Sequence, residues 1–336
     1  MRRAADVPEG AIHKIRHEFE TLRGNAAGDA SVREIAVWTP PGWDGLTPLP
    51  LMCDLVGYTG TGHSHLNWKP FGLNIPDRLA CLHQRGAIGD VIVVLPDCFT
   101  RFGGNQYVNS SAVGRYMDFL CDEVVPLVES RFPSTGRRGV FGKSSGGYGA
   151  IVHWMSRPDV WSAAVCHSGD AYFEYVYQRD FPILLRQLAP HDGDPERYLA
   201  ALHKKEKLVH DEIMGIMLLG MAATYDPVDA APGRFHLPFD ARTGELRPER
   251  WAAWLKHDPV RMLDARGANL PRRGLFVDCG RKDQYMLLYG ARMLQERLTR
   301  YGVDHVYEEF DDDHSDIDYR MDVSLPWLFR ELAVPR

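Results

Sequence analysis

The chain has 336 residues, of which 45% are hydrophobic, and its formal net charge is −6. This length and hydrophobic content suffice for a large core, so we expect one α/β domain with a cap rather than two independent domains. The acidic balance and the lack of a basic cluster exclude a typical nucleic-acid-binding protein, and no stretch reaches transmembrane length.

The first ten residues and the cysteines bear on location. The start contains two arginines but no apolar segment of the kind found in a secretory signal. The six cysteines are dispersed, and several fall in strand-like segments, which indicates buried thiols in a reducing compartment. We therefore expect a cytoplasmic protein that needs no disulfide bonds.

The first informative element in chain order is a strand-like run at residues 50–56, which leads into a glycine-rich loop at residues 57–62. Glycine leaves the backbone free to turn its amides toward a ligand, so the N–H of Tyr58 is a candidate donor, with Thr59 as second choice. Taken alone, the segment is more typical of an ordinary flexible βα loop.

Two histidines and a tryptophan follow this loop. In an extended segment His63 and His65 would share one side, as metal ligands can, but no carboxylate or cysteine set completes a site, so we expect no metal. One of the two, His63 or His65, is better interpreted as a residue of the substrate cleft. Trp68 could stack on a sugar or an aryl group, although a partly buried packing role is the default for an aromatic residue.

The most informative segment is residues 139–149, GVFGKSSGGYG, in which Gly142, Ser144 and Gly146 form a G-x-S-x-G motif after an apolar strand. A serine at the apex of a tight strand-to-helix turn is crowded by neighbouring chains, and the flanking glycines relieve that crowding. The segment predicts a nucleophile elbow with Ser144 as the nucleophile. The N–H of Ser145 is then the first oxyanion donor, and that of Tyr58 the second.

Two features superficially resemble phosphate-binding loops. One is the glycine-rich loop at residues 57–62, and the other is the Lys143-Ser144 pair, which echoes the end of a Walker A motif. The upstream glycine that this motif requires is absent. Nucleotide binding is therefore discarded, and no cofactor is expected.

The next strand-like segment, residues 162–167, precedes Asp170. Because the loop after this strand opens beside the elbow, Asp170 is a candidate substrate contact. A helix or turn cap is an equally good interpretation of this residue.

The 139 positions from Ser144 to Asp283 (283 − 144) exceed what one or two βα units need, which indicates an insertion at residues 172–263. Apolar residues recur at helical spacing in residues 182–188 and 207–223, and a further helix is expected at residues 249–256. Prolines and glycines break the chain between the last two. An insertion here emerges at the carboxyl ends of the strands, where α/β proteins bind ligands, so we interpret it as a cap over the active site.

This interpretation divides the chain into a first part of the core at residues 1–171, the cap at 172–263 and a second part of the core at 264–336. Methionines and aromatic residues of the cap could line an acyl or aryl pocket, although Met-rich stripes are more often core. Trp251 and Trp254 are typical of a helix face packed inward, and equally of a subunit interface, so a homodimer stays open.

The last two elements supply the histidine that takes the proton of a serine nucleophile and the carboxylate that orients this histidine. An apolar strand at residues 274–279 runs into a turn with Asp283. Asp278 is the nearest rival acid, but it falls inside the strand, where side-chain direction and burial count against it. The next strand, residues 306–310, is followed by His314 in an aspartate-rich loop. We expect Asp283 to orient His314, in the α/β-hydrolase order of serine, acid and histidine.

Taken in order, these segments make the chain resemble the esterase D-like, or putative esterase, branch of the α/β-hydrolases. That branch includes feruloyl and acetylxylan esterases, enterochelin esterases, S-formylglutathione hydrolase and the mycolyltransferases. The resemblance covers most of the chain. Residues 33–43, with a strand and a proline-glycine turn, and the strand at residues 91–97 also match it.

The chain departs from the family pattern at two places. Val56-Gly57 stands where the family commonly has His-Gly, which affects the second oxyanion donor. Asp312-Asp313 precede the expected base, where Gly-Gly-His or a similar sequence is common. This second departure bears on loop geometry rather than on the role of the histidine.

The resemblance implies an α/β-hydrolase fold, a mostly parallel central sheet flanked by helices, with a largely helical cap. It also implies a serine carboxylesterase that acts on a small to medium ester through Ser144, Asp283 and His314. Two alternatives stay open. One is an acyltransferase with the same triad, as the resemblance to mycolyltransferases permits, and the other is a non-catalytic binding protein of this fold.

Overall fold

The structure is a computed structural model and describes residues 4–333, in which strands and helices alternate over most of the chain. The strands are β1 (Ala11–Glu18), β2 (Val32–Thr39), β3 (Leu49–Leu55), β4 (Ile92–Leu95), β5 (Asn109–Ser110), β6 (Gly114–Arg115), β7 (Ser134–Lys143), β8 (Ala163–His167), β9 (Leu275–Gly280) and β10 (His305–Phe310). The helices are α1 (Ile75–Gln84), α2 (Tyr116–Asp118), α3 (Val125–Glu129), α4 (Ser145–Ser156), α5 (Phe173–Val176), α6 (Phe181–Leu188), α7 (Pro195–Leu202), α8 (His210–Tyr225), α9 (Pro248–Leu255), α10 (Pro259–Arg266), α11 (Leu287–Arg300) and α12 (Met321–Ala333). Short 3₁₀ turns lie at Glu20–Leu22, Gly62–Leu66, Gln178–Asp180, Ala189–His191, Gly267–Asn269 and Ile317–Arg320, and a π-helical segment, Phe119–Val124, joins α2 to α3.

The centre of the molecule is an eight-stranded sheet in the order β1-β2-β4-β3-β7-β8-β9-β10. The pairings β1–β2 and β2–β4 are antiparallel, and the five from β4–β3 to β9–β10 are parallel. Parallel strands end at the same edge of a sheet, so the loops after β3, β7, β8, β9 and β10 gather there. The elbow, Asp170, Asp283 and His314 all follow these strands.

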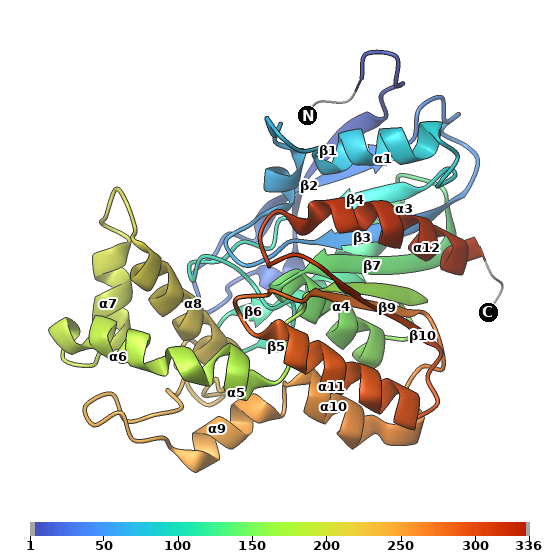
Figure 1. The fold of residues 1–336 in the computed structure, drawn as a ribbon. Helices are drawn as coiled ribbons and strands as arrows, with labels where there is room; N and C mark the ends of the chain where they lie inside the picture. Colours follow the sequence, from blue (N-terminus) through green and yellow to red (C-terminus); the bar gives the residue numbers. More distant parts are fainter. Residues whose placement is uncertain (1–3, 334–336) are drawn as a thin grey trace.

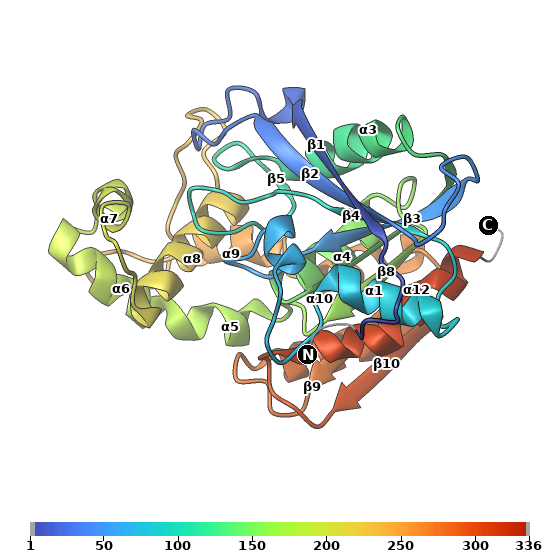
Figure 2. The same ribbon diagram turned by 90° about the horizontal axis from the view of Figure 1, so that it is seen from above.

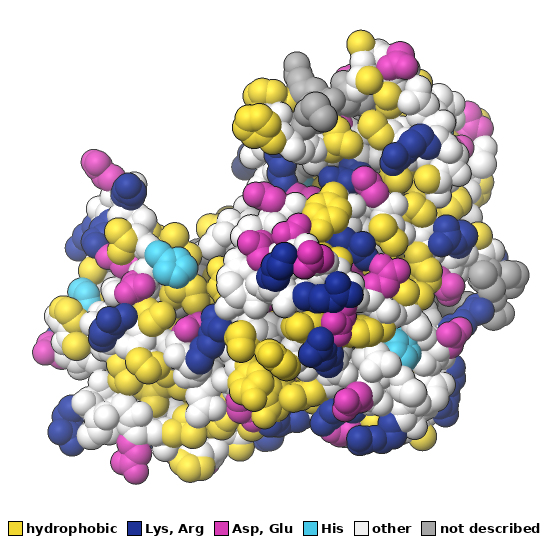
Figure 3. Space-filling view, viewed as in Figure 1, with side chains coloured by type: hydrophobic (Ala, Val, Ile, Leu, Met, Phe, Trp, Pro, Cys, Tyr) yellow, Lys and Arg dark blue, Asp and Glu magenta, His cyan; other side chains and the backbone are white. Residues whose placement is uncertain are grey.

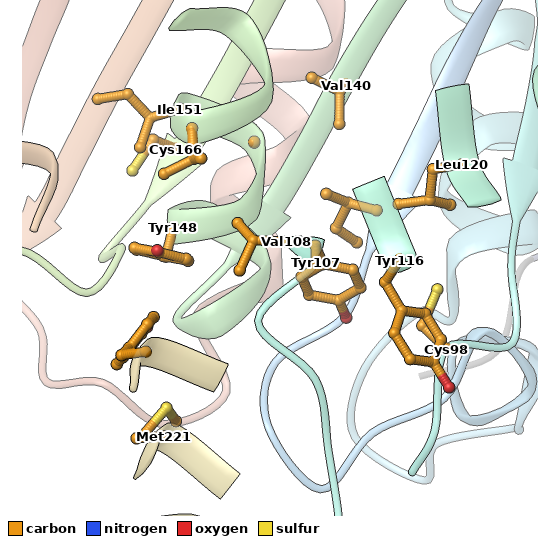
Figure 4. Packing of buried hydrophobic residues seen from close by; sticks show 14 of the residues in the cluster. Cys98, Tyr107, Val108, Tyr116, Leu120, Val140, Tyr148, Ile151, Cys166 and Met221 are labelled. Carbon is orange, nitrogen blue, oxygen red and sulfur yellow. The ribbon is translucent and has the colours of Figure 1, made fainter. Parts of the chain in front are cut away.

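Side chains that alternate along the strands build a core on each face of the sheet. The larger core packs against α4, α10, α11 and the α2–α3 segment, and the smaller one against α1 and α12 (Figure 1). Figure 4 shows part of the larger core, with Tyr148 and Ile151 on α4, Val140 on β7 and Met221 on α8. Because Met221 is in the expected cap, the cap and the sheet share one continuous apolar core.

The helices α5 to α9 extend from one end of the sheet, with α6 and α7 farthest from it (Figure 1, Figure 2). The helices α6, α8 and α9 occupy the three segments for which the sequence predicts helices. Trp254 is 1% exposed and its ring lies 5.7 Å from that of Phe181 and 5.5 Å from that of Tyr225. Trp251 packs on Phe181 as well, so both tryptophans face inward.

The strand β1 has no counterpart in the sequence analysis. It pairs with β2 at the edge of the sheet, and of its eight residues only Ile15 is buried. An edge strand with mostly exposed side chains lacks the apolar pattern by which strands are recognised, so only the pairing reveals it.

On the face of the sheet that α12 covers, a second set of serine, histidine and aspartate side chains lies together. His167 of β8 contacts Asp278 of β9 through Nδ1, at 2.6 Å, and Ser324 of α12 through Nε2, at 2.8 Å. Arg320 donates to the other oxygen of Asp278, at 2.9 Å. The three side chains are at most 2% exposed, so this network fastens α12 to the sheet and has no access for a substrate.

We expect Asp278→Ala to destabilise the protein strongly, because His167 and Arg320 would lose their buried partner. Removing one member of a buried ion pair costs about 3–5 kcal/mol. The free energy of unfolding in a urea titration measures the loss. Asp264→Ala, which breaks the exposed ion pair with Arg297, should cost at most about 1 kcal/mol. Equal losses in the two variants would contradict a structural role for the buried network.

Candidate active site

Ser144 forms the sharp turn between the end of β7 and the start of α4. Its φ of 58° lies in the left-handed region, which is uncommon for a residue with a side chain, so the backbone is strained there. The Ser144 N–H donates to the carbonyl of His167 at the end of β8, at 2.9 Å. This is the backbone of a nucleophile elbow, as the G-x-S-x-G motif predicts.

The neighbouring strand explains the flanking glycines. A Cβ on Gly142 would lie 2.3 Å from the carbonyl oxygen of Leu55, and one on Gly146 would lie 1.8 Å from the same atom. A Cβ on Gly147 would lie 2.8 Å from the carbonyl oxygen of His167. Side chains at these positions would therefore push β3 and β8 away from the elbow.

Asp283 and His314 lie in contact above the ends of β9 and β10. His314 Nδ1 is 2.8 Å from Asp283 Oδ2, and the N–H of Tyr285 donates to Asp283 Oδ1 at 2.9 Å. The His314 N–H donates to Gln284 Oε1, and the Tyr285 ring meets the imidazole edge to face at 4.9 Å. These contacts orient the imidazole, and within residues 4–333 its Nε2 makes no hydrogen bond.

The rival acid, Asp278, faces the opposite side of the sheet and contacts His167 rather than His314. The two aspartates lie five positions apart, one in β9 and one in the turn after it. The sequence preference for Asp283 as the partner of His314 therefore agrees with the geometry.

The loop after β3 is anchored so that its backbone lies against the elbow. The Tyr58 hydroxyl donates to the carbonyl of Phe102 at 3.0 Å, and this ring end packs so closely on α8 that a Cβ on Gly220 would lie 2.0 Å from the hydroxyl oxygen. A Cβ on Gly57 would lie 3.6 Å from Ser144 Cβ. The side chain of Tyr58 thus fixes the loop, and its backbone stays beside the serine.

The backbone N–H groups around Ser144 differ in whether they already donate a hydrogen bond. Thr59, with φ at 69°, donates its N–H to the carbonyl of Gly103 at 3.0 Å, so this amide is occupied. Ser145 is the first residue of α4, where backbone N–H groups have no partner within the helix. Within residues 4–333, neither the Ser145 N–H nor the Tyr58 N–H has a protein acceptor. Of the two candidates in the loop, Tyr58 is therefore the available donor.

Ser144 and His314 border one cavity of about 260 Å³ between the sheet and the cap, which we call the inner cavity. Apolar side chains from α5, α8 and the start of α11 cover it. The residues that line it are Gly57, Tyr58, Thr59, Lys143, Ser144, Ser145, Asp170, Val176, Tyr177, His210, Ile213, Met214, Met217, Tyr285, Leu287 and His314. Within the described chain Ser144 Oγ makes no hydrogen bond, so the hydroxyl is available to a ligand in this cavity.

Asp170 lies in the wall of the inner cavity and is 5% exposed. Its Oδ2 accepts from the Tyr177 hydroxyl at 2.7 Å, from Gln106 Nε2 at 3.3 Å and from Ser145 Oγ at 3.3 Å. Burial raises the pKa of Asp170 above its ordinary value, and the hydrogen bonds from Tyr177 and Gln106 oppose this shift. The carboxyl therefore positions Ser145, the residue after Ser144, and also faces the cavity.

Two of the expected cleft residues lie elsewhere. His63 Nε2 is 3.0 Å from Glu34 on β2, and Trp68 is 56% exposed. Neither belongs to the lining of the inner cavity, whereas Thr59 and Asp170 do. In residues 4–333 no three His, Cys, Asp or Glu side chains are grouped in a way that could hold a metal ion.

The structure adds residues that the sequence analysis did not assign to the site. His210 begins α8, and Gln106 lies in a loop with no motif of its own. Lys143, whose sequence context resembles only the end of a Walker A motif, borders the cavity beside Ser144. The motif indicates its position in the chain, but the direction of its side chain depends on the packing of the loops.

Within residues 4–333 no helix combines the length and apolarity needed to cross a bilayer.

The chain matches a known protein family and is similar to several solved structures. Residues 86–324 match the family model described as putative esterase. An S-formylglutathione hydrolase from Agrobacterium tumefaciens is similar at a TM-score of 0.61 and 18% identity, covering 99% of this chain and 98% of that chain. A ferulic acid esterase gives 0.59 and 16%, covering 96% and 99%. FphF, a fluorophosphonate-binding serine hydrolase from Staphylococcus aureus, gives 0.58 and 17%, covering 97% and 100%.

At these identities the likeness to solved structures is one of fold, and it agrees with the mostly parallel sheet and flanking helices described above. The α/β-hydrolase fold expected from the sequence is thereby confirmed. The match to the family model extends from before β4 to α12 and so spans well over half of the chain. The chain belongs to the putative esterase family and is a carboxylesterase.

Proposed function

We propose that this carboxylesterase hydrolyses esters through an acyl-enzyme on Ser144. The observation that carries the proposal is that a serine on a strained elbow and a histidine held by a buried aspartate border the same cavity. A serine hydroxyl needs such a base to become a nucleophile, and the base needs a carboxylate to fix its tautomer.

In the first half-reaction Ser144 Oγ attacks the carbonyl carbon of the ester while His314 Nε2 takes its proton. The negative charge that develops on the carbonyl oxygen is stabilised by the N–H groups of Ser145 and Tyr58. The bond from the carbonyl carbon to the leaving oxygen then breaks, and His314 returns the proton to the leaving alcohol. Asp283 stabilises the imidazolium throughout.

In the second half-reaction water takes the place of the alcohol. His314 removes a proton from the water as it attacks the acyl carbon, and Ser144 leaves with that proton restored. The free acid is released and the serine hydroxyl is regenerated.

The acyl group is proposed to lie under the cap. The apolar part of the inner cavity is formed mainly by Val176 of α5, by Ile213, Met214 and Met217 of α8, and by Leu287 of α11. A volume of about 260 Å³ suits a small to medium acyl group. Thr59 and Asp170 are proposed substrate contacts because they border this cavity. We do not extend that proposal to His63 and Trp68, which lie outside it.

We expect Ser144→Ala to lose turnover by at least about 10³-fold, because no other group supplies the nucleophile. Hydrolysis of p-nitrophenyl butanoate and labelling by a fluorescent fluorophosphonate, with peptide mapping, measure the loss. The control is Ser324→Ala, which removes the hydroxyl of the buried serine, histidine and aspartate network. Labelling should disappear in the first variant and persist in the second. Near-normal turnover by Ser144→Ala would rule out the acyl-enzyme.

We expect Met217→Trp to shift the acyl-chain preference toward shorter esters, because the larger side chain would fill part of the inner cavity. The measurement is kcat/KM for p-nitrophenyl acetate, butanoate and octanoate. The ratio of octanoate to acetate should fall by about tenfold, the effect of roughly 1.4 kcal/mol of lost binding. An unchanged ratio would place the acyl group outside the space under α8.

A further inference from the structure

A second cavity, of about 330 Å³, adjoins the inner cavity on the side away from the cap; we call it the outer cavity. Both are bordered by Gly57, Tyr58, Thr59 and Lys143, so they are two spaces on either side of one wall beside Ser144. The rest of the outer cavity comes from the loop after β3 and from the loop after His314. Its further lining residues are Val56, Gly60, Ser64, His65, Lys69, Asp316 and Asp318.

The two cavities differ in chemistry. Beyond the shared wall, the inner cavity is lined mainly by apolar and aromatic side chains, whereas the outer cavity is lined by charged ones. The surface seen in Figure 3 mixes acidic and basic side chains and gives a charged ligand no broad patch of one sign. Selection by charge would therefore have to come from groups inside the outer cavity.

Most charged groups of the outer cavity already have partners. Lys69 is paired with Asp318. His65 Nδ1 lies 2.5 Å from the fully buried Asp54. Burial acts against a charged His65 ring, but Asp54 outweighs this effect and raises the pKa of His65 above its ordinary value. Asp316 is exposed at the outer end of the cavity.

Lys143 differs from these groups. Within residues 4–333 its ammonium makes no ion pair and no hydrogen bond, although its side chain is only partly exposed. Burial lowers the pKa of Lys143, while the more distant Asp318 and Asp316 oppose this shift. A partly desolvated ammonium without a partner is unfavourable, and an anionic ligand would relieve this cost. Lys143 also comes directly before Ser144, so such a ligand would lie beside the reacting ester.

We propose that the outer cavity receives the leaving group of the ester, and that Lys143 selects an alcohol that carries a negatively charged group. The inference rests on the proposed acyl-enzyme at Ser144, with the acyl group in the inner cavity. Asp316 and His314 lie two positions apart in one loop, so a leaving group in the outer cavity is next to the loop of the residue that would protonate it. The substrate class is thus an apolar acyl group joined to an anionic alcohol.

The opposite assignment, a cationic leaving group, has weaker support. Of the two aspartates in the outer cavity, Asp318 is neutralised by Lys69, and Asp316 is exposed to solvent, which screens its charge. Lys143 would repel a cation at the inner end of the cavity.

The test uses three butanoate esters that differ only in the charge on the leaving phenol. They are the esters of 3-hydroxybenzoic acid, 3-hydroxybenzamide and (3-hydroxyphenyl)trimethylammonium, which are anionic, neutral and cationic. The measurement is kcat/KM for each ester, divided by its rate of cleavage by a neutral nucleophile such as imidazole to remove differences in leaving-group reactivity. We expect the unmodified protein to prefer the anionic ester to the neutral one by about tenfold or more, which corresponds to roughly 1.4 kcal/mol.

Lys143→Met should lower this preference by about tenfold, mainly through a higher KM for the anionic ester, and Lys143→Arg should retain most of it. The matched control is Lys207→Met, an exposed lysine between α7 and α8, which should leave the preference unchanged. High salt should weaken the preference of the unmodified protein, because it screens a partly exposed charge.

The outcomes separate this inference from the proposed function. Hydrolysis of all three esters with no preference, or with the cationic one preferred, would overturn the role of Lys143 and leave the acyl-enzyme intact. A preference that survives in Lys143→Met would also overturn it. Absence of hydrolysis of every ester, with no fluorophosphonate labelling of Ser144, would instead overturn the proposed function.

Discussion

The site depends on the close contact between the elbow and the strand β3. The carbonyl oxygen of Leu55 lies where a Cβ of either Gly142 or Gly146 would be, so two glycines are required for Ser144 to keep its left-handed backbone. The same contact brings the loop after β3 against the serine. A strained serine and the amide of Tyr58 therefore come from one packing arrangement, and neither could move without the other.

The structure contains two groups of serine, histidine and aspartate, and their surroundings differ. In one, Asp283 holds His314 at the carboxyl ends of the strands, where loops leave a cavity beside Ser144. In the other, Asp278 holds His167 between the sheet and α12, where close packing leaves no space. The same residue types thus lie in one place beside a cavity and in the other within a closed core.

The two cavities beside Ser144 have walls of different chemistry. Helices α5 and α8 supply apolar side chains above the inner cavity, while the loops after β3 and β10 supply charged ones around the outer cavity. The structural neighbours share this fold but are named for different substrates, ferulic acid and S-formylglutathione. The residues on the outer side, rather than the fold, would then decide which alcohol is accepted.

Elements whose signal is local could be predicted from the amino-acid sequence. The glycines around Ser144, the strands before Asp283 and His314, and the apolar residues of α8 are all signals from neighbours in the chain, and each element is found where it was expected. Three features follow only from the packing of distant segments: the pairing of the exposed strand β1, the occupied amide of Thr59, and the ammonium of Lys143, which has no partner within residues 4–333. These depend on which distant segments pack together, because a hydrogen bond or an ion pair across the sheet leaves no periodic pattern in the residues that form it.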